Sequence, residues 1–237
     1  RAGFEANIIE NHDQPRGASL FIPEEDYGFY SLSALATIIF CERGLPFLYQ
    51  GQEIGMSNRR WKYDEFNDLE TINQYQIALK AGMSKEQALE IARHHSRDNA
   101  RTPMQWSSEE NAGFSKGKPW MPVNENYKVV NVAEEEKEYG SILNFYKRLI
   151  AFYKSEEYNE ILTYGDFRPI YEKEDHIFAY SRSYGCQKLV LICNFSSKEK
   201  DIELSEDYEN VIFVNYEQTT VIGNTLKMKP YECVIYE

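Results

Sequence analysis

The sequence lacks long apolar runs, basic clusters and closely spaced cysteines. No apolar run in its 237 residues approaches the roughly 20 residues that cross a bilayer. The opening run RAGFEANIIENHD shows neither the charged nor the apolar part of a signal peptide. These absences predict that the chain has no membrane partner.

Positive charge is also scarce, because 26 Lys and Arg residues stand against 38 Asp and Glu residues, a formal charge of −12. Phosphate neutralisation by Lys and Arg supplies most of the affinity of proteins for nucleic acids. No stripe of Lys and Arg compensates for the acidic balance. We therefore expect no nucleic-acid partner.

The four cysteines, Cys41, Cys186, Cys193 and Cys233, form no C-x-x-C pair and have no histidine at zinc spacing. This pattern supports neither a metal site nor a redox motif, and it predicts reduced thiols in the core. A cytoplasmic location is the expectation that fits reduced thiols.

Apolar and aromatic residues are plentiful, at 42% and 14% of the chain, which is enough to build a core. The chain begins with Arg1 rather than Met, and a strand-like run at 6–9 follows almost at once. We therefore expect the chain to be a piece of a longer protein.

The first part of the chain reads as α/β. The apolar run at 6–9 and Phe47–Tyr49 resemble buried parallel strands, and residues 29–41, with Gly44 and Pro46 behind them, predict a buried helix between them. Residues 57–96 predict a polar helical insertion, with a capping box at 84–87. Residues 97–128 predict a long ordered loop anchored by Trp106 and Trp120, and 141–154 a further helix.

The last part of the chain alternates apolar and polar residues in short runs. Strand candidates lie at 176–182, 188–195, 210–216 and 231–236, with turns at 183–185 and 222–224 between some of them. This spacing predicts an antiparallel all-β domain over roughly 160–237.

Chemically active side chains crowd into Asn11-His12-Asp13-Gln14-Pro15-Arg16, directly after the first expected strand. Active sites of α/β proteins lie at the carboxyl ends of their strands, so Asp13 is a candidate for acid, base, nucleophilic or electrostatic work. An Asx turn that pairs Asp13 with Arg16 is the structural alternative.

Three motifs occur in the order typical of the α-glucosidases of the α-amylase superfamily, glycoside hydrolase family 13. They are Asn11–Arg16, Gly44–Met56 (GLPFLYQGQEIGM) and Arg97–Trp106 (RDNARTPMQW). The chain resembles the oligo-1,6-glucosidases of that family most, over nearly its whole length. The resemblance implies the C-terminal half of a (β/α)₈ TIM barrel, with strands seven and eight in residues 1–159, and an antiparallel β-sandwich in residues 160–237.

The resemblance also implies a division of labour. In the family, an Asp nucleophile and a Glu acid/base precede the matched region, so the chain is expected to be inactive without the N-terminal half of the barrel. Asp13 would be the third carboxylate, which holds sugar hydroxyls and stabilises the oxocarbenium-like transition state. His12 would donate to the same hydroxyls, and Arg97 would reach the terminal glucose and pair with a carboxylate of the missing half.

Other residues have secondary roles in this interpretation. Arg16 would lie near the sugar subsites or brace Asp13, Arg101 would be structural, and Glu53 would be structural rather than a second catalytic carboxylate. His94, His95 and His176 have no partner at metal spacing. No metal and no cofactor is expected.

The substrate is expected to be a short oligosaccharide with a terminal α-1,6- or α-1,4-linked glucose. Many family members carry an arginine where this chain has Leu20, so trehalose-6-phosphate hydrolases and sucrose-acting relatives stay open as alternatives, although Ala100 favours the oligosaccharide α-glucosidases. A non-catalytic carbohydrate-binding module built on the β domain is an alternative of another class.

Overall fold

The computed structural model describes residues 3–205, 208 and 210–237. Contacts between residues divide the chain into two compact units. The first unit holds the described residues of 1–8, 26–47 and 145–237, and the second holds 9–25 and 48–144. Each unit is described by itself below.

The first unit contains a βαβ arrangement, as predicted. Strands β1 (Ala6–Asn7) and β2 (Leu45–Pro46) pair in parallel, and α2 (Phe29–Cys41) lies between them in the chain. The expected strand at Phe47–Tyr49 is wrong by two residues. Gly44 explains the position of β2, because its φ is +135° and an added Cβ would lie 2.3 Å from Oδ1 of Asn7, so glycine admits β1 at this point.

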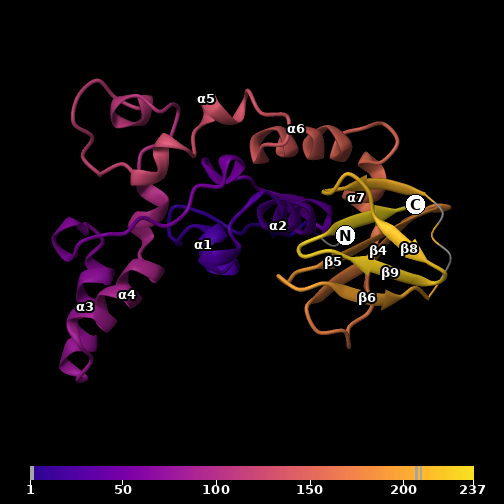
Figure 1. Ribbon diagram of the computed structural model, residues 1–237, viewed down its shortest axis with the longest axis horizontal. Helices are drawn as coiled ribbons and strands as arrows, with labels where there is room; N and C mark the ends of the chain where they lie inside the picture. The colour runs from indigo at the N-terminus through magenta and orange to yellow at the C-terminus, as the bar shows by residue number, and fades with distance from the viewer. Residues whose placement is uncertain (1–2, 206–207, 209) are drawn as a thin grey trace. The chain divides into compact units, whose positions relative to one another are not determined.

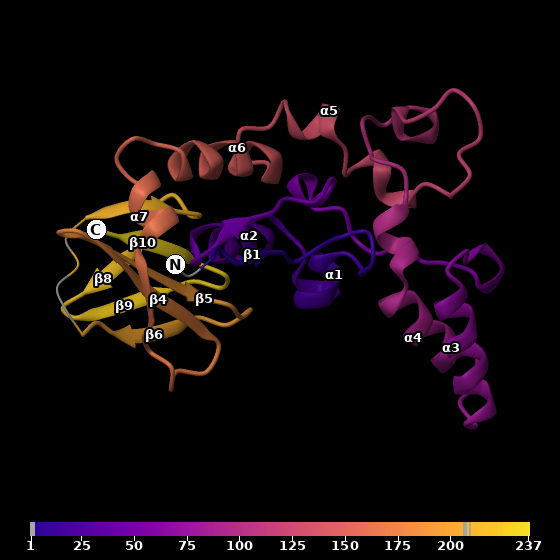
Figure 2. The same cartoon turned by 180° about the vertical axis from the view of Figure 1, so that it is seen from behind.

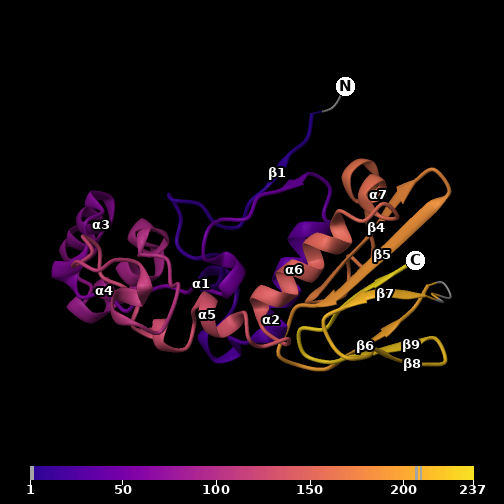
Figure 3. The ribbon, with the colours of Figure 1, turned by 90° about the horizontal axis from the view of Figure 1, so that it is seen from above.

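The β-sandwich of the first unit has two antiparallel sheets, which Figures 1 and 3 show as separate layers. The five-stranded sheet has the order β3 (Asp166–Pro169), β4 (Ile177–Tyr184), β5 (Gln187–Asn194), β10 (Cys233–Tyr236) and β7 (Val211–Val214). The three-stranded sheet has the order β6 (Lys200–Glu203), β9 (Thr225–Met228) and β8 (Thr220–Ile222). All four strand candidates of the sequence are confirmed.

Alternate residues of both sheets meet in one apolar core, which explains why the strands read with period two. Its buried members are Ala179, Val190, Ile192, Ile202, Leu226, Met228, Val234 and Tyr236. The expected domain boundary at 159/160 stays a prediction.

Helices cover the opposite face of the five-stranded sheet. The hydroxyl of Tyr180 donates to the carbonyl of Ile38 in α2 (3.1 Å), and the buried guanidinium of Arg182 donates to the carbonyls of Cys41 (2.7 Å) and Gly165 (3.0 Å). Burial lowers the pKa of Arg182. Helices α6 (Ile142–Tyr153), where the sequence predicts a helix at 141–154, and α7 (Asn159–Tyr164) precede the strands.

The cysteine prediction is confirmed for three residues and wrong for one. Cys41, Cys193 and Cys233 are free and buried, whereas Cys186 is free and exposed beside the β4–β5 turn. Among the residues that the structure describes, no helix has the length and apolar character of a membrane span.

The second unit consists of short helices and long ordered connections. Helices α3 (Leu69–Lys80) and α4 (Lys85–His95) lie side by side (Figures 1 and 2). Ser84 and Gln87 form the predicted capping box at the start of α4, with distances of 3.1 and 3.2 Å. The other helices are α1 (Gly17–Phe21) and α5 (Val132–Glu135).

The long loop at 97–128 is irregular, as predicted, except for three short 3₁₀ turns. They are η4 (Arg97–Arg101), η5 (Glu110–Gly113) and η6 (Glu125–Lys128). Three further 3₁₀ turns precede this loop in the chain: η1 (Glu24–Asp26), η2 (Gln52–Ile54) and η3 (Tyr63–Glu65). The expected anchors are wrong, because the side chains of Trp106 and Trp120 are 51% and 78% exposed. One buried apolar cluster of this unit is formed by Trp61, Phe66, Tyr75, Ala88, Ala92 and Met121, and a second by Ile54, Met56, Met104 and Leu143.

Candidate active site

The loop that carries Asp13 is an Asx turn. The side-chain oxygen of Asn11 accepts a hydrogen bond from the backbone N–H of Asp13 (2.8 Å), two residues on. Asn11, rather than Asp13, therefore supplies the turn that the sequence suggested. This leaves the carboxylate of Asp13 for contacts outside its own loop.

Asp13 is exposed and lies among three basic side chains. Its Oδ1 accepts from Nη2 of Arg101 (2.9 Å) and lies 3.8 Å from Nη1 of Arg97. Its Oδ2 lies 3.2 Å from Nε2 of His12. The side chain of Asp13 is 54% exposed, so this carboxylate is both fixed in direction and accessible to a ligand.

The contacts of Arg101 fit the structural role expected of it. Besides its bond to Asp13, its Nε donates to the backbone carbonyl of His12 (2.9 Å). One guanidinium thus holds both the side chain of Asp13 and the backbone beside it. The sequence did not indicate that Asp13 is the partner of Arg101, because the two residues are 88 positions apart in the chain.

Arg97 pairs with a carboxylate of this chain, and its expected pairing with a carboxylate of the missing half stays a prediction. Its Nη2 and Nε donate to the two carboxylate oxygens of Asp68, at 2.5 and 3.1 Å, and a Glu70 oxygen lies 3.5 Å away. Burial alone would raise the pKa of Asp68, but hydrogen bonds from Arg97 and Thr71 outweigh burial and lower it to about 2. Asp68 in turn raises the pKa of Arg97.

Sequence reasoning missed Asp68, although one local signal could have indicated it. Asp68 is the N-cap of α3, and its Oδ1 accepts from the backbone N–H of Glu70 (3.3 Å). Such a residue is recognisable before a helix, but its second role as the partner of Arg97 depends on the tertiary fold.

Arg16 does not brace Asp13, which was one of the two roles expected of it. It is buried and pairs with Glu10 instead. Its side chain is 1% exposed, and its Nη1 lies 3.1 Å from Oε2 of Glu10, which is equally buried. The same nitrogen donates to the carbonyl of Gln50 (2.7 Å), and Nε donates to the carbonyl of Asn99 (3.3 Å). Arg16 therefore ties together segments that lie far apart in the sequence.

Burial raises the pKa of Glu10 even though Arg16 acts in the opposite direction. Glycine is required beside this ion pair: a Cβ added at Gly51 would lie 2.4 Å from Sδ of Met56 and 2.9 Å from Nη1 of Arg16. Sequence reasoning did not identify Glu10 as a partner of Arg16.

Glu53 has the structural role expected of it, because its Oε2 accepts from the backbone N–H of Gly51 (2.7 Å).

Asn99 fixes the turn that carries Arg97 and Arg101. Its fully buried amide accepts from Nε1 of Trp61 (2.7 Å) and donates to the carbonyl of Arg93 (2.8 Å). Within the described parts of the chain, no group of three or more His, Cys, Asp and Glu side chains could hold a metal ion.

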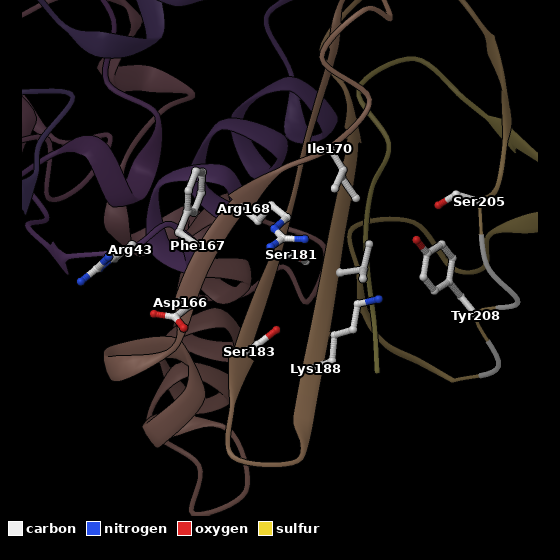
Figure 4. Close-up of a pocket in the computed structure, with 11 residues that line it drawn as sticks. Arg43, Asp166, Phe167, Arg168, Ile170, Ser181, Ser183, Lys188, Ser205 and Tyr208 are labelled. Carbon is white, nitrogen blue, oxygen red and sulfur yellow. The ribbon is translucent and has the colours of Figure 1, made fainter.

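Two cavities lie elsewhere in the described residues. One of about 590 Å³ lies in the second unit, and its lining includes Asp64, Trp120 and Tyr127. The other, of about 580 Å³, lies at the β3 edge of the sandwich. Figure 4 shows it, with Asp166, Ser183 and Lys188 following one another across β3, β4 and β5.

Comparisons with known proteins show families and relatives that this chain resembles. The family described as "Alpha amylase, catalytic domain" matches residues 1–165, and the family described as "Alpha-amylase SusG C-terminal domain" matches residues 177–235. The chain is 39% identical to an oligo-1,6-glucosidase of Bacillus cereus over 241 residues, which span 99% of this chain and 43% of the relative.

Solved structures agree with these matches. The trehalose-6-phosphate hydrolase of Bacillus licheniformis superposes with a TM-score of 0.91 at 37% identity, over 99% of this chain and 43% of its own. The isomaltulose synthase SmuA of Protaminobacter rubrum superposes with a TM-score of 0.89 at 34% identity, over 100% of this chain and 43% of its own. The chain thus spans less than half the length of these relatives.

Proposed function

The chain belongs to the α-amylase family, glycoside hydrolase family 13, and on that premise we propose that it is part of a retaining hydrolase that cleaves terminal α-linked glucose from short oligosaccharides. The bonds cleaved are α-1,6, α-1,4 or both. One observation carries the proposal: the exposed carboxylate of Asp13 is held by Arg101 and His12 in the loop after a parallel strand. The membership also confirms the predicted family and fold class.

Asp13 acts as a binding and stabilising carboxylate in this proposal. Both of its oxygens already have a basic neighbour, which fixes their direction and suits them to accept hydrogen bonds from two sugar hydroxyls. Such bonds strengthen as positive charge develops on the sugar ring, so they lower the barrier more than they stabilise bound substrate. His12 donates to the same hydroxyls, and Arg97 flanks the glucose.

In this proposal, the chain alone does not turn over substrate. Glycoside hydrolysis needs two carboxyl groups, about 5–5.5 Å apart in a retaining enzyme. Glu53 accepts a hydrogen bond from the backbone of Gly51, and Asp68 is paired with Arg97, and these contacts favour structural roles for both carboxylates. The nucleophile and the acid/base would belong to an N-terminal barrel segment that this chain does not contain.

The test measures the release of nitrophenol from p-nitrophenyl α-glucoside. The 237-residue chain should release none, whereas a full-length protein that contains it should release nitrophenol and lose nearly all kcat with Asp13→Asn. The matched control is Glu53→Gln, which should keep most of the kcat of a folded enzyme. Turnover by the chain alone, or an active Asp13→Asn full-length enzyme, would contradict the proposal.

A second candidate within the same family is a trehalose-6-phosphate hydrolase or a sucrose-acting enzyme. The structural likeness to a trehalose-6-phosphate hydrolase and to an isomaltulose synthase supports it. Glucose release from isomaltose, trehalose 6-phosphate and sucrose by the full-length protein separates the candidates. We expect isomaltose to have the highest kcat/KM.

The alternative of a carbohydrate-binding β domain receives less support. The described residues that line the cavity in Figure 4 include three cations, Arg43, Arg168 and Lys188, and one carboxylate, Asp166. Among these described residues, the excess of positive charge favours an anion over a neutral sugar. The cytoplasmic location stays a prediction.

A further inference from the structure

We propose that the cavity of the second unit is a second saccharide-binding site, which takes a neutral oligosaccharide by stacking a pyranose ring on Trp120. None of the residues that line this cavity is among the contacts of Asp13. The lining includes Asp64, Glu65, Asn67, Glu110, Lys118 and Trp120.

Trp120 is the feature that indicates a ligand. Its side chain is 78% exposed, although an indole is among the largest apolar surfaces that a protein can bury, and it lies where the chain forms a hollow of about 590 Å³. Pockets for small molecules span about 300–1,000 Å³ and combine apolar faces with a few polar groups. A flat indole face matches the apolar C–H face of a pyranose ring.

The polar groups of the cavity suit sugar hydroxyls. Carboxylates of Asp64 and Glu110 accept hydrogen bonds, the ammonium of Lys118 donates them, and the amide of Asn67 does both. Each hydroxyl of a sugar can donate and accept hydrogen bonds, so sugar hydroxyls can pair with all of these groups.

Charge narrows the class of ligand. Arg59 donates to both oxygens of Glu65 (2.7 and 3.2 Å), so this carboxylate is already paired. Asp64 and Glu110 then stand against Lys118 alone among the charged lining residues, a negative excess that disfavours phosphates and sulfates. A neutral polyhydroxylated ligand fits, and its identification as an α-linked gluco-oligosaccharide rests on the proposed function.

The walls of the cavity are fixed before a ligand arrives. The side chain of Asn111 donates to the carbonyls of Ser115 (3.1 Å) and Gly117 (3.2 Å), which closes the loop ahead of Trp120. Gly113 has a φ of +66°, and an added Cβ would lie 2.5 Å from Oγ of Ser107, so the two sides of this loop are in close contact there. Such rigidity reduces the entropy that binding must overcome.

Saturation-transfer NMR with isomaltotriose and the 237-residue chain tests the proposal. We expect saturable binding that Trp120→Ala weakens at least about fivefold. Trp106→Ala is the matched control, because Trp106 is 51% exposed and does not line the cavity. Asp64→Ala provides a second variant with an exposed side chain, and circular dichroism verifies that every variant is folded.

Asp13→Asn distinguishes this site from the proposed active site. Binding that Trp120→Ala and Asp64→Ala weaken, and that Asp13→Asn and Trp106→Ala leave unchanged, supports the proposal. Binding that only Asp13→Asn weakens overturns the second site and leaves the proposed function intact. No binding of isomaltotriose by the folded chain also overturns it.

Discussion

Replacing Arg16 with methionine tests whether the buried ion pair with Glu10 holds the second unit together. Methionine replaces the unbranched stem of the arginine but removes the guanidinium, and with it the charge and the hydrogen bonds to the carbonyls of Gln50 and Asn99. Because both members of the pair are 1% exposed, the variant leaves a buried carboxylate without a cation. Loss of one partner of a buried pair costs about 3–5 kcal/mol in the free energy of unfolding.

The pH dependence of this loss has a defined sign. Burial raises the pKa of Glu10 above 4.5, so its protonation stabilises the folded state below pH 4.5, and this stability is lost as the pH rises through the folded pKa. Arg16 opposes the rise, and its removal raises the pKa of Glu10 further. The stability difference between wild type and Arg16→Met should therefore widen with pH, by at most about 1.4 kcal/mol per pH unit.

Urea unfolding at about pH 5 and about pH 7.5 measures both effects. The matched control is Arg60→Met, because Arg60 forms an ion pair with Glu24 (2.8 Å) in which both side chains are largely exposed, and its unfolding midpoint should stay close to that of wild type. A variant within about 0.5 kcal/mol of wild type at both pH values, or a difference independent of pH, would refute the reasoning.

Three further substitutions test the frame of the site by urea unfolding. Asp68→Asn should lower the free energy of unfolding by about 1–2 kcal/mol at neutral pH. Because the pKa of Asp68 is lowered from 3.8 to about 2, the stability difference from wild type should shrink as the pH falls through this range, and a difference independent of pH would contradict the prediction. Gly51→Ala should cost about 1–3 kcal/mol, because φ is +92° and the new Cβ meets Met56; wild-type stability would contradict this. Asn99→Ala should cost at least about 2 kcal/mol by leaving the indole N–H of Trp61 without an acceptor; a smaller cost would contradict this.

Local patterns predicted the elements of the chain well. The capping box at Ser84, the helices α2 and α6 and the strands β4 and β5 all depend on residues that are neighbours in the sequence, so periodicity reveals them. The family was also predictable, because three motifs occur in a fixed order. Strand β2 differs from its expected position and ends at Pro46, because strand pairing depends on a distant segment, and β3, β6, β8 and β9 were not among the strand candidates.

Side-chain partners across the fold were not predictable from local patterns. Arg97 bonds to Asp68, 29 residues away, and Arg101 bonds to Asp13, 88 residues away. No pattern within a window of the sequence distinguishes these pairs from the many others that charge would allow. The exposure of Trp120 is a second example, since a tryptophan in a loop is expected to anchor it.

The run Asn11–Arg16 shows why closeness in the sequence is a poor guide to shared function. Asp13 and Arg16 are three residues apart, yet Asp13 is exposed and Arg16 is buried. Arg16 holds the backbone at Gln50 and Asn99, and the turn around Asn99 carries the arginines that flank Asp13. Part of the motif therefore contacts the ligand in the proposed function, and part of it fixes the segments on which those contacts depend.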